Sequence, residues 1–167
     1  MLFFLVVLCL LVQAILLLKY GIITDIEALK YSAEANNFLL HSSFSEQKYI
    51  FYSVYIFIHI AFIKLGFETI GVYAFQLIIN LLATLLFYKT ALNVYKNIRI
   101  AFISAFLLII CLSWQYWTTS LYTESFFCCM IIIFTYCLFG ISKKTNLKYL
   151  YAALSFCILL FARPTGI

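Results

Sequence analysis

Residues Lys19–Lys48 have the sequence KYGIITDIEALKYSAEANNFLLHSSFSEQK and form the longest polar interval of a chain that is otherwise mostly apolar. This interval holds four of the six acidic residues, namely Asp25, Glu27, Glu34 and Glu46. Acids beside long apolar segments point to function, because charged side chains near lipid are costly. We therefore predict that the interval lies at a membrane surface and forms half of an active site facing out of the cytoplasm.

The composition is that of a membrane protein. Hydrophobic residues make up 66% of the 167 residues, and only 10% are charged. A water-soluble domain carries about 25% charged residues, so a soluble fold is excluded. Backbone in lipid must satisfy its own hydrogen bonds, and one helical crossing takes ~20 residues. We predict an all-α transmembrane bundle of about five spans and a juxtamembrane helix, forming one domain over 1–167.

The charges at the segment ends predict a topology. The formal net charge is +5, but the basic residues are sparse and lie at segment ends, which is typical of membrane topology rather than nucleic-acid binding. Loops 89–99 and 141–148 are basic and contain no acid, so the positive-inside rule places both in the cytoplasm. The external loops are then 19–69 and 113–124. The predicted spans are 1–18, 70–88, 100–112, 126–139 and 149–162.

One apolar segment, Tyr49–Gly66, leaves part of this topology open. Its Tyr52, Tyr55 and His59 have helical spacing, which allows either a membrane crossing or an interfacial helix. If the segment does not cross, all six acids share the outer face; if it crosses, the polar interval lies inside. Charge counting does not decide between the two, because acids contribute little to the positive-inside rule.

The first part of the polar interval predicts an amphipathic helix from residue 24 to about residue 40. The helical period gives it one apolar line and one polar line. The apolar line consists of Ile26, Leu29 and Ala33, and the polar line consists of Glu27, Tyr31 and Glu34.

Two acids at the start of this helix are candidate catalytic groups. Thr24 and Glu27 match a capping box, in which Glu27 would bond to an unpaired backbone N–H. For Glu27, capping and catalysis remain alternatives. Asp25 is not needed by that box, so it is the better candidate for a free carboxylate. The alternative for Asp25 is a favourable interaction with the helix dipole.

Two further candidates lie far along the chain. Glu124 stands at the edge of an apolar run, where an acid usually has a functional reason. The aromatic residues just before it are typical of a belt at the membrane interface. Arg163 follows the last predicted span and is the one arginine expected on the outer side. It can pair with a phosphate or extend to the interface.

These features, taken in order, resemble a known family. The acidic loop with Glu27, Tyr31 and Ala35 is followed by FYSVYIFIHIAFIKLGF, GVYAFQLIINLLATLLFYKTALNVY, WTTSLYTESFF and LLFARPTGI. Over essentially its whole length the chain resembles the polytopic GT-C glycosyltransferases. The most similar branch is family 39-like, which includes protein O-mannosyltransferases and lipid A aminoarabinose transferases. The family's first-loop acid is usually aspartate, whereas here that spacing is filled by Glu27, with Asp25 two residues earlier.

The resemblance implies a membrane enzyme that transfers a sugar from a polyprenyl-phosphate donor to an acceptor on the extracytoplasmic side. It implies that an acid of the first external loop, Asp25 or Glu27, is the general base, and it maps a second acid to Glu124. In some members such acids hold a divalent metal, here Asp25 and Glu124. Lys30, Tyr31 and Arg163 are the expected substrate-binding residues.

The expected setting is a bacterial inner (plasma) membrane, with a lipid-linked sugar donor and membrane lipids as partners and no nucleic acid. Family members have more spans than this chain has room for. We therefore expect an N-terminal portion of an enzyme, inactive alone. The alternative is a non-enzymatic transporter or flippase subunit, which would carry polar residues near the bilayer midplane. Only Gln13, Gln76, Asn80 and a few hydroxyls interrupt the predicted spans.

Overall fold

The computed structural model describes residues 1–140 and 146–163, with side chains described for 1–139 and 149–163. Most of the predicted basic loop 141–148, including the side chains of its lysines, lies outside the described part, as do residues 164–167. Every regular element in the described ranges is a helix, which confirms the all-α prediction.

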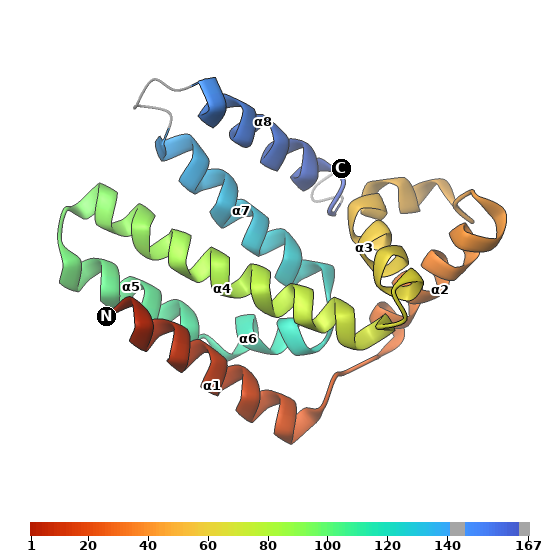
Figure 1. Ribbon diagram of the computed structural model, residues 1–167, viewed down its shortest axis with the longest axis horizontal. Helices are drawn as coiled ribbons and strands as arrows, with labels where there is room; N and C mark the ends of the chain where they lie inside the picture. The colour runs from red at the N-terminus through yellow and green to blue at the C-terminus, as the bar shows by residue number, and fades with distance from the viewer. Residues whose placement is uncertain (141–145, 164–167) are drawn as a thin grey trace.

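Helix α4 lies at the centre of the bundle. Helices α1, α5 and α7 pack along it, α8 packs against α7, and the pair α2 and α3 lies near the N-terminal end of α4 (Figure 1). The elements are α1 Leu2–Tyr20, α2 Ile26–His41, the 3₁₀ helix η1 Gln47–Tyr52, α3 Ser53–Lys64, α4 Glu68–Tyr95, α5 Ile98–Ile110, α6 Leu112–Thr119, α7 Thr123–Gly140 and α8 Asn146–Leu160.

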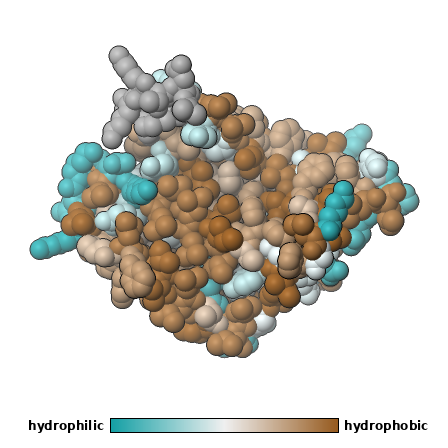
Figure 2. All heavy atoms as spheres, in the orientation of Figure 1, coloured by the Kyte–Doolittle hydropathy of each residue, from teal (hydrophilic) through white to brown (hydrophobic). Residues whose placement is uncertain are grey.

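Two helices of the described part are long and apolar enough to cross a membrane, α1 with 19 residues and α4 with 28. Helices α5 and α6 together would form a third span, bent by 53° between them. Helices α7 and α8 are apolar but shorter. Figure 2 shows a largely hydrophobic surface over the bundle, with hydrophilic residues gathered towards its ends. Membrane-spanning helices are thus supported for two segments, and the larger predicted number stays a prediction.

Helix α3 bears on the segment that left the topology open. It has 12 residues, which rise about 18 Å and fall short of the ~30 Å hydrocarbon core. Its Tyr55 and His59 are buried in contact with neighbouring elements, and it packs against both α2 and α4. Helix α3 by itself is therefore shorter than a straight membrane crossing, and the position of 49–66 relative to the membrane stays a prediction.

Two predicted loops are mostly helical. Helix α4 continues to Tyr95, so the prediction of a loop over 89–99 is wrong for most of its length. Ala91 and Leu92 pack into a cluster with α1 and α5, and this burial extends the helix past the charged Lys89. The break is confined to the left-handed Lys96 and to Asn97, which caps α5. Likewise, the predicted external loop 113–124 contains most of α6.

A cluster of buried polar side chains joins α6 to α1 and α4. The Asn80 amide nitrogen donates to Gln115 Oε1 at 2.8 Å and to Thr118 Oγ1 at 3.3 Å. Trp114 Nε1 donates to Asn80 Oδ1 at 2.9 Å, and Gln13 Nε2 donates to Gln115 Oε1 at 2.7 Å. Interhelical hydrogen bonds of this kind hold helices together in lipid. Trp114 is one of the aromatic residues before Glu124 that were predicted to form an interfacial belt. Its indole N–H bonds to the buried Asn80 of α4.

Candidate functional site

Helix α2 is capped by Asp25. The Asp25 Oδ1 atom accepts a hydrogen bond from the Ala28 backbone N–H at 3.3 Å, and the helix begins at Ile26. The predicted capping box of Thr24 and Glu27 is therefore wrong. Aspartate is as good an N-cap as threonine, and here it occupies the capping position one residue later. Glu27 therefore does not cap the helix. Asp25 caps the helix and is also a candidate catalytic base.

The buried face of α2 also differs from the predicted one. Ile26 and Leu29 of the predicted apolar line are 76% and 55% exposed. The face that packs inward carries Tyr31 and Ala35, because these residues join the hydrophobic cluster that contains Tyr55 of α3. The tertiary contacts with α3 therefore decide which side of α2 is buried.

Glu34, expected beside Glu27 and Tyr31, has a different partner. Its carboxylate is buried and accepts hydrogen bonds from the backbone N–H and the hydroxyl of Ser45, at 2.6 and 2.5 Å. Glu34 thus holds the connection between α2 and η1 against α2 through Ser45.

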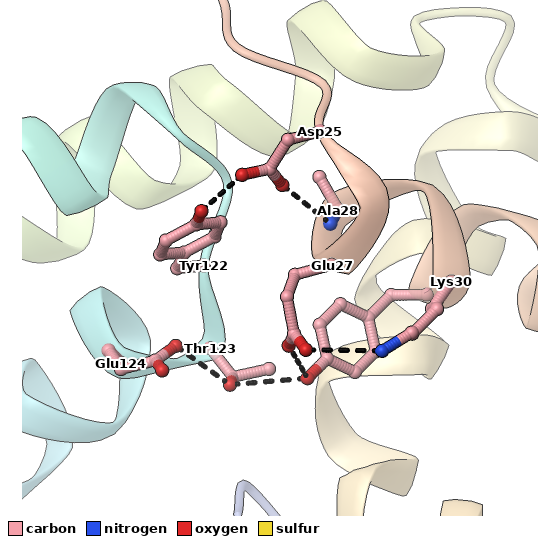
Figure 3. A network of polar contacts seen from close by, with 8 residues as sticks. Asp25, Glu27, Ala28, Lys30, Tyr122, Thr123 and Glu124 are labelled. Atoms are coloured by element: carbon pink, nitrogen blue, oxygen red, sulfur yellow. Dashed lines mark hydrogen bonds and ion pairs between the residues drawn. The ribbon is translucent and has the colours of Figure 1, made fainter.

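The turn between α6 and α7 meets the start of α2. The Ile23 backbone N–H donates to the Thr119 carbonyl oxygen at 3.0 Å, which aligns the segment before α2 with the end of α6. The Tyr122 hydroxyl then donates to Asp25 Oδ2 (Figure 3). This contact with Asp25 raises the pKa of Tyr122 from its ordinary value of 10 to about 12.

A chain of polar contacts runs from Glu27 to Glu124. The Tyr31 hydroxyl lies 3.5 Å from both Glu27 Oε2 and Thr123 Oγ1, and the Thr123 hydroxyl donates to Glu124 Oε2 at 3.3 Å (Figure 3). Burial raises the pKa of Tyr31 well above its usual range. The phenol is therefore a stable hydrogen-bond donor between the two acidic ends of the chain.

Each end of this chain of contacts carries an ion pair. Lys30 Nζ lies 3.2 Å from Glu27 Oε1, with both side chains about half exposed. Arg163 Nη1 lies 3.0 Å from Glu124 Oε1, and this pair is more buried. The result is a cluster in which two hydroxyl groups lie between two carboxylates, and each carboxylate is paired with a cation.

The structure brings together all the residues predicted for the site. They come from the start of α2, the start of α7 and the third residue after α8, and they are Asp25, Glu27, Lys30, Tyr31, Glu124 and Arg163. Tyr122 and Thr123 were missed as site residues, although they are the two residues just before the predicted acid Glu124. Their hydroxyls beside Glu124 were the signal that could have identified them.

The predicted metal ligands do not form a metal-binding set. Among the described residues, no group of three or more His, Cys, Asp or Glu side chains is arranged to hold a metal ion. The Asp25 carboxylate is bonded to Ala28 and Tyr122, and the Glu124 carboxylate to Thr123 and Arg163. Both acids therefore already have protein partners.

Comparison with family models, with curated proteins and with solved structures finds no match to this chain. The class of protein is therefore given by the fold itself. It is an all-helical chain with two helices able to cross a membrane. A cluster of acids, hydroxyls and cations lies where the segment after α1 meets the start of α7.

Proposed function

We propose that the chain forms the acceptor-side part of a membrane glycosyltransferase. The enzyme transfers a sugar from a polyprenyl-phosphate donor to an acceptor hydroxyl on the extracytoplasmic face of a bacterial inner membrane. The observation that carries the proposal is the meeting of Asp25, Glu27 and Glu124 with Lys30 and Arg163, through contacts that join residues 92 and 97 positions apart. The ordered series of segments that resembles the GT-C glycosyltransferases supports the same function.

The chemistry of transfer needs both kinds of group found in the cluster. The acceptor oxygen bonds to the sugar carbon while the bond from that carbon to the phosphate oxygen breaks. A carboxylate of the cluster, Asp25 or Glu27, takes the acceptor proton as the new bond forms. The phosphate leaves with the electron pair, and its negative charge calls for charge-assisted donors. The Arg163 guanidinium has five N–H groups, and a single donor–acceptor pair accounts for its contact with Glu124.

A transporter or flippase subunit is the second candidate function. The buried polar cluster around Asn80 favours it, because polar residues within a bundle can mark a pathway. Here, however, Gln13, Asn80 and Gln115 bond to one another, as expected of interhelical contacts. Purified protein in vesicles separates the two functions: transfer of the sugar supports the enzyme, and movement of the lipid-linked sugar without transfer supports the transporter.

We expect Arg163→Ala to weaken binding of the polyprenyl-phosphate sugar about 10- to 100-fold, because a lost hydrogen bond to a charged group costs about 1.5–3 kcal/mol. The donor KM or Kd of the complete gene product measures this effect. Lys48→Ala is the matched control, since Lys48 also pairs with a carboxylate but in an exposed pair with Glu46. Unchanged affinity in Arg163→Ala would assign Arg163 no part in donor binding.

The proposed orientation predicts the accessibility of two introduced cysteines. In a variant without the native cysteines, Ser43→Cys should react with a membrane-impermeant thiol reagent added outside intact cells. Asn93→Cys, near the C-terminal end of α4, should react only after the membrane is permeabilised. Both positions are exposed in the structure, so burial does not explain a difference. The opposite pattern would place the acidic cluster on the cytoplasmic face.

A further inference from the structure

Gln76 links the central helix α4 to the turn that carries Tyr122. Its side chain is 1% exposed, and its Nε2 atom donates to the Tyr55 hydroxyl at 2.7 Å and to the Tyr122 carbonyl oxygen at 3.1 Å. Tyr55 in turn donates to the Leu121 carbonyl oxygen at 2.7 Å. Two consecutive carbonyl groups of the turn are therefore held by side chains from α4 and α3.

The backbone of this turn needs such support. Leu121 has a φ of 52°, which lies in the left-handed region and is unfavourable for a residue with a side chain. A strained conformation of this kind persists where the surrounding structure holds it in place. The bonds to the carbonyl oxygens of Leu121 and Tyr122 hold the two peptide groups on either side of the Tyr122 Cα atom.

Stability alone does not account for a glutamine at this position. Within the described part of the chain, the Gln76 Oε1 atom is buried and has no hydrogen-bond partner. An unsatisfied buried acceptor costs about as much as the hydrogen bonds of the same side chain gain. The main effect of the Gln76 amide is therefore to fix the conformation of the Leu121–Tyr122 turn, with little net gain in stability.

We propose that Gln76 is a positioning residue of the acidic cluster, which fixes the Leu121–Tyr122 turn and thereby holds the Tyr122 hydroxyl against Asp25. Gln76 itself contacts none of the acids and acts through the backbone of Tyr122. The inference rests on the proposed function only where it gives Asp25 a catalytic task. The positioning itself is measurable without a substrate.

The test follows the ionisation of the Tyr122 hydroxyl, which depends on its contact with Asp25. Fluorotyrosine placed at position 122 and titrated by ¹⁹F NMR reports this one phenol among the 13 tyrosines. With Gln76 present, the pKa should be raised, as the value of about 12 against an ordinary 10 indicates. In Gln76→Leu most of that rise should be lost, as it should be in Asp25→Asn.

The matched control is Asn80→Leu, which removes another buried amide one turn further along α4. Asn80 bonds to α6 residues, whereas the side chains that bond to the Leu121 and Tyr122 carbonyl groups are those of Tyr55 and Gln76. The pKa of Tyr122 should therefore stay raised in Asn80→Leu. Equal losses in the two variants would overturn the proposal, because they would indicate general loosening of the bundle.

A second variant, Tyr55→Phe, tests the proposal if Gln76→Leu does not fold. Tyr55→Phe keeps the ring in place and removes the hydroxyl that bonds to the Leu121 carbonyl and accepts from Gln76, while the bond from Gln76 to the Tyr122 carbonyl can remain, so a smaller fall of the same sign is expected. An unchanged pKa of Tyr122 in folded Gln76→Leu, or in folded Tyr55→Phe where Gln76→Leu does not fold, would overturn the proposal. Absence of sugar transfer would count against the proposed function and would leave this measurement unaffected.

Discussion

Asp25→Asn should lower sugar transfer about 10²–10⁴-fold, the usual effect of removing a general base. Asparagine is also a good N-cap, so α2 should still form. Its side-chain oxygen can accept from the Ala28 N–H, as Asp25 Oδ1 does, while its NH2 group takes the place of Oδ2 and can donate to the Tyr122 hydroxyl oxygen. The variant therefore keeps the cap and loses the negative charge and the ability to take up the acceptor proton. The measurement is kcat of the complete gene product with a polyprenyl-phosphate sugar donor, at matched expression.

Glu27→Gln is the control for this prediction, because Glu27 lies in the same turn of α2 and is not the cap. Its contacts with Lys30 and Tyr31 involve a half-exposed side chain, so activity within a few-fold of the parent is expected. An inactive Glu27→Gln beside an active Asp25→Asn would assign the base to Glu27. Full activity in both variants would show that this cluster is not the catalytic centre.

Asn80→Leu should lower the free energy of unfolding by about 2 kcal/mol, the scale for leaving a buried donor without a partner. Leucine fills a similar space but removes the acceptor of the Trp114 indole N–H and the donor to Gln115 and Thr118. Single interhelical hydrogen bonds in membranes average about 0.6 kcal/mol, so a larger loss reflects several bonds made by one side chain. Denaturant-induced unfolding in detergent micelles, followed by helical circular dichroism, measures the difference.

Thr90→Val provides the comparison within the same helix. Among the described residues, the Thr90 hydroxyl bonds only to the Leu86 carbonyl of its own helix, at 2.9 Å, and its side chain is half-buried. Removing it should change stability by no more than about 0.5 kcal/mol, since no second helix is involved. If both variants lost the same stability, the cluster around Asn80 would not be what holds α6 to the bundle.

The sequence by itself determined the helical class and the presence of membrane-spanning helices. Both follow from composition and from the length of apolar runs, which are properties of one segment at a time. It also identified the acids and cations of the cluster, because charges beside apolar segments are few. It did not determine helix ends. The loop predicted over 89–99 is mostly α4, because burial against neighbouring helices outweighs the local charge signal.

Only the tertiary structure decided how the candidate residues are used. The N-cap of α2 is Asp25 rather than Thr24, and the buried face of α2 is the one that meets α3. The contact of Asp25 with Tyr122 joins residues 97 positions apart, and no spacing in the sequence encodes it. The contact depends on the turn at Leu121, whose φ is left-handed. Gln76 of α4 and Tyr55 of α3 hold that turn in place. The physical reason is that a pairing between segments is set by the packing of every helix between them.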